Sequence, residues 1–444
     1  MAWDPFGNGK TAIRAGAGIA HDFIRQDLHE NTSSVSPFRL TVVNLGISLD
    51  NPWANYPGGN PFPYNFNKSN PVYAPYGAYL PVPPDMKTTT QYSWNFGIQR
   101  QIQPSVFASV NYVGTQITHV WNAIELNPAQ FLGLTPCTLN TAAGPVSYPV
   151  CSTAGNVNQR RLLNLANPSA NLGYLTQYDD GGTQNYNGLL LETRWRASEK
   201  VNLNANYTWS HCLGLPVITL LNPGANYVHQ AYQNNGPADR NLDVGDCDQD
   251  RRQIFNMTAV LQTPNFSGKV LHALGTGWSF STIFSARSGR PLNLLLGTDR
   301  ALNGFQGNTG TQRPDQVLAN PYGDRKSLAS YFKSTAFAVP ALGTYGNVGF
   351  NSVLGPGFWD WSEAVSRQFQ IREGQRIEIR AEAFNVTNSL RRGNPGTILG
   401  NANTFGRILC NAANGSATGC SLPGAGSSLA GGPRIMQFAL KYVF

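Results

Sequence analysis

The chain has 444 residues, of which 41% are hydrophobic, 11% aromatic and only 13% charged. Low charge with many aromatic side chains excludes a disordered or acidic solvating chain, because there is ample apolar surface to bury. The net charge of +8 comes from scattered Lys and Arg. Because a nucleic-acid footprint is clustered, we expect no nucleic-acid partner and at most a weak preference for anionic surfaces, lipid headgroups included.

The beginning of the chain and its apolar segments restrict how it could meet a membrane. No stretch approaches about 18 uninterrupted apolar residues, which excludes a transmembrane helix. Residues 1–7 lack the basic and apolar regions of a signal peptide. We therefore expect either a cytosolic protein or a chain that lacks its true N-terminus.

Apolar and polar residues alternate with a period of two along much of the chain, whereas helical periodicity is nearly absent. In 201–210, for example, five apolar residues alternate with asparagine, threonine and serine. Such segments have about the length that crosses a bilayer as a tilted strand. The pattern predicts about ten strands, at 10–24, 88–100, 105–117, 183–196, 201–210, 251–263, 277–287, 358–370, 376–388 and 433–444.

The connections between these strands alternate in length, so that every long link falls on one side of the sheet. The long links are 25–87, 118–182, 211–250, 288–357 and 389–432. Outer-membrane barrels have this asymmetry, with short periplasmic turns and long extracellular loops. We therefore predict an all-β fold, an antiparallel up-and-down transmembrane β-barrel. The alternative is a soluble sandwich or propeller, whose strands also alternate but rarely keep such long loops on one side.

A closed sheet in lipid pairs every backbone group internally and leaves one apolar and one polar face. In 376–388 the pattern places Glu378, Arg380 and Glu382 on the inward face, between apolar residues that face outward. Tryptophans near strand ends suit the aromatic girdles of such barrels. These are Trp121, Trp195, Trp209, Trp278, Trp359 and Trp361.

Six cysteines fall into three local groups, Cys137 with Cys151, Cys212 with Cys247, and Cys410 with Cys420. There is no CxxC and no histidine at zinc-site spacing, which favours disulfides in an oxidising compartment over metal binding. Other pairings remain open, and the local ones are the most economical. If the chain ends in the periplasm, the order of the strands places all six cysteines in extracellular loops.

Four carboxylates lie close together beside Arg251 and Arg252: Asp243, Asp246, Asp248 and Asp250. A calcium loop that begins at Asp246 requires glycine at its sixth position and an acid at its twelfth. Arg251 and Met257 occupy those positions. The cluster is therefore a weak metal candidate, and the alternative is a solvated loop rim with internal Asp–Arg pairing.

No arrangement of residues indicates catalysis or a cofactor. The histidines are dispersed and lack the HExxH pattern, and there is no Gly-x-Ser-x-Gly elbow. The sequence Gly9-Lys10-Thr11 lacks the earlier glycine of a phosphate loop, and a strand follows it. We therefore predict that the protein is not an enzyme.

The first long loop contains a patch rich in proline, tyrosine and asparagine. Its aromatic residues are Trp53, Tyr56, Tyr64, Phe66, Tyr73, Tyr76 and Tyr79. Such a surface could stack on sugars or bind peptides. Alternatively, these aromatic side chains pack the long loop against its neighbours.

An ordered set of segments resembles the TonB-dependent outer-membrane transporters, in particular Oar-like barrels with a carboxypeptidase-regulatory-like N-terminal domain. The segments are 2–18, 111–115, 185–189, 207–210, 250–255, 355–359, 380–388 and 433–444. Their order is similar to that in the C-terminal half of such a barrel. The resemblance therefore implies that 1–444 is the C-terminal portion of the barrel, a fragment without signal peptide, regulatory-like domain, TonB-contacting segment or plug.

The resemblance also implies partners and a ligand class. Outer-membrane lipid would surround the barrel, and the TonB complex would supply energy through a plug outside this sequence. A ferric chelate, an oligosaccharide or a peptide would be captured by the extracellular loops and pass through the lumen. Two alternatives remain open: a plugless passive pore or surface adhesin, and a secreted carbohydrate-binding β-protein.

The C-terminus ends with four alternating apolar residues, Phe438, Leu440, Tyr442 and Phe444. This pattern resembles the signal by which the barrel-assembly machinery recognises its substrates. Physically, it is an apolar strand edge that awaits a partner, as in strand addition. The alternative is a chance apolar terminus.

Overall fold

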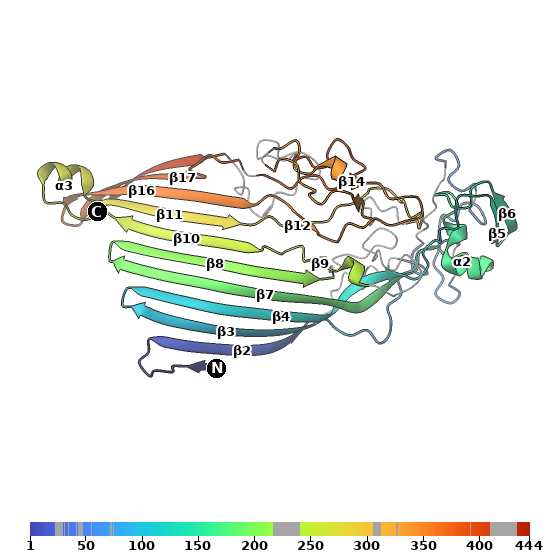
Figure 1. Cartoon of the computed structure of the whole chain (residues 1–444), viewed down its shortest axis with the longest axis horizontal. Helices are drawn as coiled ribbons and strands as arrows, with labels where there is room; N and C mark the ends of the chain where they lie inside the picture. The colour runs from blue at the N-terminus through green and yellow to red at the C-terminus, as the bar shows by residue number, and fades with distance from the viewer. Residues whose placement is uncertain are drawn as a thin grey trace.

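A computed structural model of the chain describes all residues except 23–29, 31, 34, 41, 43–47, 55, 72, 74, 216–239, 305–311, 326, 391 and 409–432. The described residues form one large antiparallel sheet with folded loops at one end (Figure 1). No helix among them has both the length and the apolar character needed to cross a membrane.

Neighbouring strands in the chain are also neighbours in the sheet, which confirms the predicted up-and-down order. The ten long strands are β2 (Thr11–His21), β3 (Thr90–Gln103), β4 (Val106–Glu125), β7 (Thr176–Ser198), β8 (Val201–Gly214), β10 (Gln253–Gln262), β11 (Trp278–Arg287), β16 (Phe358–Arg372), β17 (Gln375–Phe384) and β18 (Ile435–Val443). Two short strands complete the sheet, β1 (Ala2–Trp3) beside β2 and β9 (Gly245–Asp246) beside β8.

The connections separate into two ends, as the sequence predicted. At the short-turn end, two-residue turns join β3 to β4, β7 to β8 and β16 to β17, and a longer link contains α3 (Lys269–Gly275). At the other end, the long links carry small elements of their own (Figure 1). We call the described residues of 22–89, 126–175, 215–252, 288–357 and 385–434 the crown.

The small elements of the crown pair mostly among themselves. Its strands are β5 (Cys137–Thr141), β6 (Gly144–Tyr148), β12 (Pro291–Leu292), β13 (Asp315–Gln316), β14 (Phe337–Ala338) and β15 (Val353–Leu354). Its helices are α2 (Leu162–Ala166) and the 3-10 turns η1 (Asn158–Arg160), η2 (Pro168–Ala170), η4 (Arg240–Asp243) and η5 (Ser334–Ala336). Pairing of β5 with β6, β12 with β15 and β13 with β14 gives three separate two-stranded sheets.

The register of the large sheet separates an apolar outer face from a polar inner face, because directly paired residues share a face. One outer row runs across six strands: Val201, Leu261, Phe280, Val365, Ala381 and Phe438. Phe438 is 75% exposed, and many other outer-face side chains are similarly uncovered. No second protein layer in the described part of the chain therefore covers this face.

The buried apolar core lies in the crown. Its main cluster comes from the fourth and fifth long links: Leu292, Leu294, Tyr331, Phe332, Ala336, Phe337, Val348, Val353, Phe405 and Ile408. A smaller cluster joins Val35 and Leu80 to Ala123 and Tyr178, which lie near the crown ends of β4 and β7. The crown ends of β4 and β7 therefore pack against crown residues.

β4 and β7 are longer than the alternation predicted, because they continue into the crown. The pairing shifts on both sides of Val120, next to His119, which has a positive φ of 54°. Such a bulge re-aims the side chains that follow. Trp121 consequently packs on Tyr178, with ring centroids 5.9 Å apart, and donates to the Lys87 carbonyl at 2.8 Å. The prediction that Trp121 belongs to an aromatic girdle is therefore wrong.

The other five tryptophans expected in girdles lie on the outer face, toward the strand ends. Register pairs Trp195 with Val106, Trp359 with Ala286, and Trp361 with Phe284. Trp209 lies near the crown end of β8, and Trp278 begins β11 at the short-turn end. Gly114 shows how closely this face packs, because a Cβ there would lie 2.2 Å from the Trp94 ring.

Candidate functional site: the crown and the inner wall

A fully buried arginine connects the second long link to the fourth. Arg160 donates from Nη2 to the carbonyls of Thr153 and Leu302, each at 2.9 Å, and from Nε to Asn156 Oδ1 at 2.9 Å. It also donates to the Gln130 carbonyl. Burial lowers the pKa of the Arg160 guanidinium to about 10, because desolvation disfavours the charged form. The carbonyl cage offsets that cost.

A second buried arginine extends this connection. The Arg161 guanidinium lies 4.0 Å from the centre of the Tyr174 ring and donates to the Asn127 carbonyl at 2.9 Å. The Tyr174 hydroxyl in turn donates to the Gly304 carbonyl. Glu125, also fully buried, accepts from the Leu175 N–H at 2.8 Å. The second and fourth links are therefore one packed unit.

Neither arginine was among the candidate residues that the sequence indicated. Arg160 and Arg161 are adjacent basic residues in a loop that is otherwise almost uncharged, and this is the only local signal that could have drawn attention to them. Their partners lie up to 142 positions away, so no local pattern could have identified the contacts.

The four clustered carboxylates each have a partner. Asp243 accepts from Arg313, Asp246 pairs with His211, Asp248 accepts from Asn351, and Asp250 accepts from the Cys212 N–H. Within the described residues no group of three or more acidic, His or Cys side chains could hold a metal ion. The expected internal Asp–Arg pairing is present, because Arg252 lies 3.5 Å from Asp246 and 3.6 Å from Asp250. The expected solvated rim is wrong for Asp243 and Asp250, which are buried. This cluster holds the loop in place.

Two of the three expected local cysteine pairs are disulfides. Cys137 and Cys151 close the base of the β5–β6 hairpin, with S–S 2.08 Å. Cys212, near the crown end of β8, is bonded to Cys247, with S–S 1.97 Å. Cys410 and Cys420 lie outside the described residues. The second disulfide thus connects the sheet directly to the crown.

Most aromatic residues of the first long loop pack that loop together. Tyr56 and Tyr76 are buried with ring centroids 6.3 Å apart, and the Tyr56 hydroxyl donates to the Pro75 carbonyl at 2.6 Å. Burial raises the pKa of Tyr56 to about 12. Trp53 packs on Tyr56 at 5.3 Å. Tyr56 and Tyr76 were expected as possible ligand contacts. In the structure they are buried and pack the loop.

Two other aromatic residues of this loop differ in exposure. The Tyr64 hydroxyl donates to the Pro37 carbonyl at 2.7 Å, which fixes a half-buried ring. Tyr73 is 59% exposed and lies 6.0 Å from Tyr79. Among the seven aromatic residues of this patch, only Tyr73 has more than half of its surface exposed.

Tyr73 and Tyr79 line an apolar cavity of about 550 Å³ between the first and second long links. The other main lining residues are Val35, Phe38, Leu80, Leu172 and Leu175. Pockets that bind small molecules are typically apolar with few polar groups. This cavity can accept an apolar or aromatic group.

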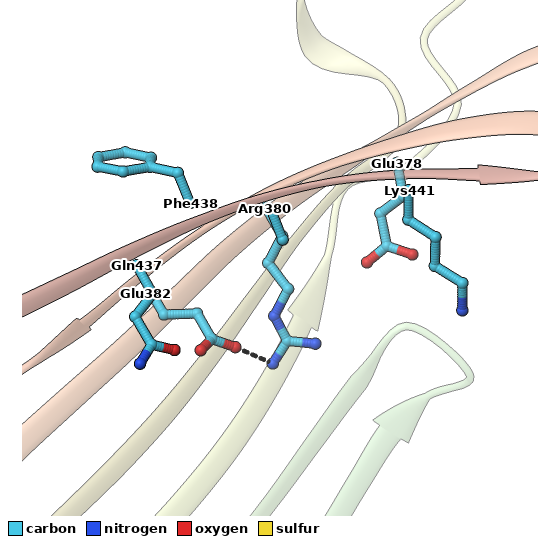
Figure 2. Close-up of a pocket in the computed structure, with 7 residues that line it drawn as sticks. Glu378, Arg380, Glu382, Gln437, Phe438 and Lys441 are labelled. Atoms are coloured by element: carbon cyan, nitrogen blue, oxygen red, sulfur yellow. Dashed lines mark ion pairs between the residues drawn. The ribbon is translucent and has the colours of Figure 1, made fainter.

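The inner face of the sheet is polar and partly charged. Figure 2 shows Glu378, Arg380 and Glu382 on the same side of β17 and β18, while Phe438 points to the other side. Arg380 pairs with Glu382 at 2.5 Å, and Glu378 and Lys441 line the same cavity of about 390 Å³. The inward placement predicted for these three side chains of β17 agrees with the register.

The polar inner face continues across the sheet. One row crosses six strands: Ser109, Glu192, Asn206, Asn256, Ser285 and Asp360. Asn256 Nδ2 donates to Asn206 Oδ1 at 3.0 Å. A second cavity of about 610 Å³ lies beside Glu192, Arg194 and Arg196, near the short-turn end. The inner wall therefore suits water and hydrogen-bonding solutes.

Glu363 is an exception on the outer face. Register pairs it with Thr282 and Ala383, and it accepts from the Thr282 hydroxyl and from Trp361 Nε1 at 3.2 Å. The sequence analysis did not single out this residue. Its two donors satisfy part of a carboxylate that would otherwise be costly among apolar neighbours.

The C-terminal strand forms one edge of the sheet, because β18 pairs only with β17 among the described strands. Phe438, Leu440 and Tyr442 lie on its outer face, and Tyr442 packs on Phe444 at 6.0 Å. No pairing in the described part joins β18 to β1 or β2. The backbone groups on the free side of β18 are therefore available to a further strand.

Comparison with known proteins gives one family. The family model described as outer membrane beta barrel domain matches residues 1–437. Curated protein sequences give no match.

Several solved structures have a similar chain course. The outer membrane transporter YddB from Escherichia coli is 12% identical, with 89% of this chain and 36% of that chain covered and a TM-score of 0.39. The ferric-catecholate import receptor Fiu from E. coli K12 is 8% identical, with 98% and 33% covered and a TM-score of 0.36. FpvA of P. aeruginosa, bound to heterologous pyoverdines, is 8% identical, with 100% and 32% covered and a TM-score of 0.36. The chain spans about a third of the length of these structures.

Proposed function

Since the chain belongs to the outer membrane beta barrel domain family, we propose that it is the barrel portion of a TonB-dependent transporter. Family membership places the chain in the outer membrane of a Gram-negative-type bacterium. That location excludes a secreted protein that never enters lipid. Within the proposal the crown is extracellular and the short turns are periplasmic, which is how long loops and short turns are distributed in such barrels. What we propose beyond the family and its location is the dependence on TonB and the class of ligand.

The observation that carries the proposal is the separation of the two faces. Apolar rows such as the one ending at Phe438 face outward without protein cover, while rows such as the one through Asn206 and Asn256 face inward. Hydrocarbon stabilises the first arrangement and water the second. A folded crown above a polar wall is the arrangement that capture and passage of a ligand require.

Within this proposal, the crown captures the ligand. Its second and fourth links are held together by Arg160 and Tyr174, which fixes the wall that Leu172 and Leu175 of the second link contribute to the apolar cavity beside Tyr73. Preformed sites lose less conformational entropy when they bind. A ferric chelate, an oligosaccharide or a peptide remains the proposed ligand class, with an apolar or aromatic group that occupies this cavity.

The proposal also takes 1–444 as the C-terminal portion of the barrel. Further strands would pair with the free edge of β18 and with the opposite edge, formed by β1 and the part of β2 that β1 leaves unpaired. A plug that contacts TonB would come from polypeptide outside these residues. The outward row Phe438, Leu440 and Tyr442, with Phe444, would be recognised by the barrel-assembly machinery. An open edge of nine residues in β18 supports such pairing.

Uptake by cells that carry the native gene tests this function. The probes are a labelled ferric chelate, an oligosaccharide and a peptide, each measured with and without a working TonB complex. We expect one probe to be taken up, and its uptake to be lost without TonB. Uptake that persists without TonB, together with steady ion conductance in planar bilayers, would instead establish the passive pore.

A pair of variants tests the proposed capture site. Tyr73→Ser, in the cavity, should lower uptake of the accepted probe several-fold, because an aromatic wall is lost. Phe62→Ser alters an exposed ring of the same loop that packs on Trp53 and does not line the cavity, and should leave uptake unchanged. Equal effects of the two substitutions would remove the cavity from the proposal.

A further inference from the structure

The longest connection at the short-turn end, 263–277, folds into the helix α3 (Figure 1). Every residue from Lys269 to Leu274 is exposed. Three of these residues are large and apolar: Val270 is 71% exposed, Leu271 61% and Leu274 68%. A helix that served only to connect two strands would not need three uncovered aliphatic side chains.

These three side chains form one stripe. With 3.6 residues per turn, positions 270, 271 and 274 fall within an arc of about 100°. Lys269 and His272 lie on the opposite side of the helix, where His272 Nδ1 is 3.1 Å from the Phe266 carbonyl oxygen. α3 therefore has an apolar side that is uncovered and a polar side that faces its own link.

Hydrogen bonds from the outer face hold α3 on that side of the sheet. Trp278 Nε1 donates to the Leu274 carbonyl at 2.8 Å, and Arg367 Nε donates to the Thr276 carbonyl at 3.2 Å. Arg367 also donates to the Ala273 carbonyl. Trp278 and Arg367 are directly paired and belong to the outer face. α3 is thus attached to the lipid side of the rim, away from the inner wall.

The uncovered stripe continues a surface that lies against lipid. The outer-face residues next to the link are Leu261, Phe280 and Phe369, all exposed and apolar. The link contains Lys269 and no acidic residue. A short amphipathic helix with this charge suits the boundary between headgroups and acyl chains of a leaflet that contains anionic phospholipid.

We propose that α3 is an interfacial helix, with Val270, Leu271 and Leu274 inserted into the periplasmic leaflet of the outer membrane. Arg367 and Trp278 position it there by holding the carbonyls at its C-terminal end. This contact anchors the periplasmic rim of the sheet between β10 and β11. The inference depends on the outer-membrane location and is independent of TonB and of any ligand.

Site-specific fluorescence tests the insertion. The full chain carrying Leu271→Cys is labelled with an environment-sensitive fluorophore and reconstituted into vesicles of equal parts phosphatidylethanolamine and phosphatidylglycerol. The matched control carries the label at Glu373→Cys, in the turn between β16 and β17 at the same end of the sheet. Unsubstituted protein treated with the same label gives the background.

The two labels should respond oppositely to two quenchers. Quenchers attached to acyl chains should reduce the emission at position 271 several-fold more than at position 373, and aqueous iodide should do the reverse. Equal iodide quenching at both positions would overturn the proposal. Protection at position 271 from both quenchers would also overturn it, because another protein or a second copy would then cover the stripe.

A further substitution separates insertion from misfolding. Val270→Ser with Leu274→Ser is introduced into the labelled Leu271→Cys chain, and heat-modifiable gel migration verifies that the sheet is folded. We expect acyl-chain quenching at position 271 to fall to the level at position 373. Unchanged quenching in the folded variant would show that the apolar stripe does not hold α3 in lipid.

Discussion

The sheet and the crown use the same residue types in opposite ways. Phe438 on the sheet is 75% exposed, whereas Phe332 in the crown is 3% exposed. Arg380 lies on the open inner wall, whereas Arg160 is enclosed by backbone carbonyls. The sheet depends on lipid to cover its apolar side chains, whereas the crown buries its apolar side chains in a core of its own. The two regions should therefore respond to different perturbations.

The sheet and the crown should respond differently because different interactions stabilise them. A sheet in lipid is maintained by backbone hydrogen bonds that cannot be exchanged for water. The crown has only short strands and helices, so its order rests on buried apolar packing, enclosed charges and disulfides. Substitutions in the crown should loosen it while the sheet remains folded, and substitutions on the outer face should do the opposite.

The largest effect is expected from Arg313→Met in the crown. Arg313 donates to Asp243 Oδ1 at 2.6 Å and to the Val348 carbonyl at 2.7 Å, and both charged side chains are almost fully buried. Removal of one partner leaves a buried carboxylate uncompensated, which costs about 3–5 kcal/mol. Hydrogen exchange should become faster in crown amides but not in strand amides.

The matched control is Arg380→Met on the inner wall. Arg380 pairs with Glu382, but its side chain is about half exposed, and exposed pairs contribute roughly 0–1 kcal/mol. If both substitutions loosen the crown equally, or if Arg313→Met melts the sheet as well, the two regions are not energetically separate.

The disulfide between Cys212 and Cys247 gives the next largest effect. It closes a segment of 35 residues between β8 and the crown, and the chain-entropy model assigns such a loop about 4 kcal/mol. Cys212→Ser with Cys247→Ser should weaken the crown near β8, measured as faster proteolysis of the third long link. Cys137→Ser with Cys151→Ser, at the β5–β6 hairpin, should affect only that hairpin. Identical cleavage patterns would contradict this distinction.

The sheet could be predicted from the sequence because lipid and water act on alternate residues of every strand. That local pattern correctly placed all ten long strands in order and put Glu378, Arg380 and Glu382 on the inner face. It failed at the crown ends of β4 and β7. There, the consecutive residues Ala123 and Ile124 are both buried, so the alternation that marks a strand with two different environments ends.

The crown could not be predicted in the same way. Arg160 contacts the Leu302 carbonyl and Tyr174 the Gly304 carbonyl, across 142 and 130 positions. Contacts at such separation leave no period in the sequence. The aromatic patch of the first loop was recognised, but only the fold could separate buried Tyr56 from exposed Tyr73. Local cysteine spacing was more informative, because a short disulfide is itself a local contact.

A charge on the outer face should affect the sheet and leave the crown intact. Phe284 lies on this face, paired with Met257 and with the girdle residue Trp361, and a cationic side chain at that depth costs up to about 1 kcal/mol. Phe284→Arg should lower the denaturant midpoint of the vesicle-inserted protein. Ser285→Arg, one residue further and on the inner wall, is the control and should change it little. Equal losses would indicate that protein, rather than lipid, covers Phe284.

The smallest effect is expected in the crown at alkaline pH. Burial raises the pKa of Tyr56 and of Tyr331 to about 12, from 10 in the unfolded chain. Between these values the unfolded state releases protons that the folded state keeps, so stability is fully present below pH 10 and declines as the pH rises toward 12. Tyr56→Phe should reduce this decline, and Tyr73→Phe, at an exposed position, should not. Tyrosinate absorbance measures the titration directly. Ionisation of Tyr56 near pH 10 in the folded protein would show that water reaches the ring and that the first loop is not packed as the rest of the crown is.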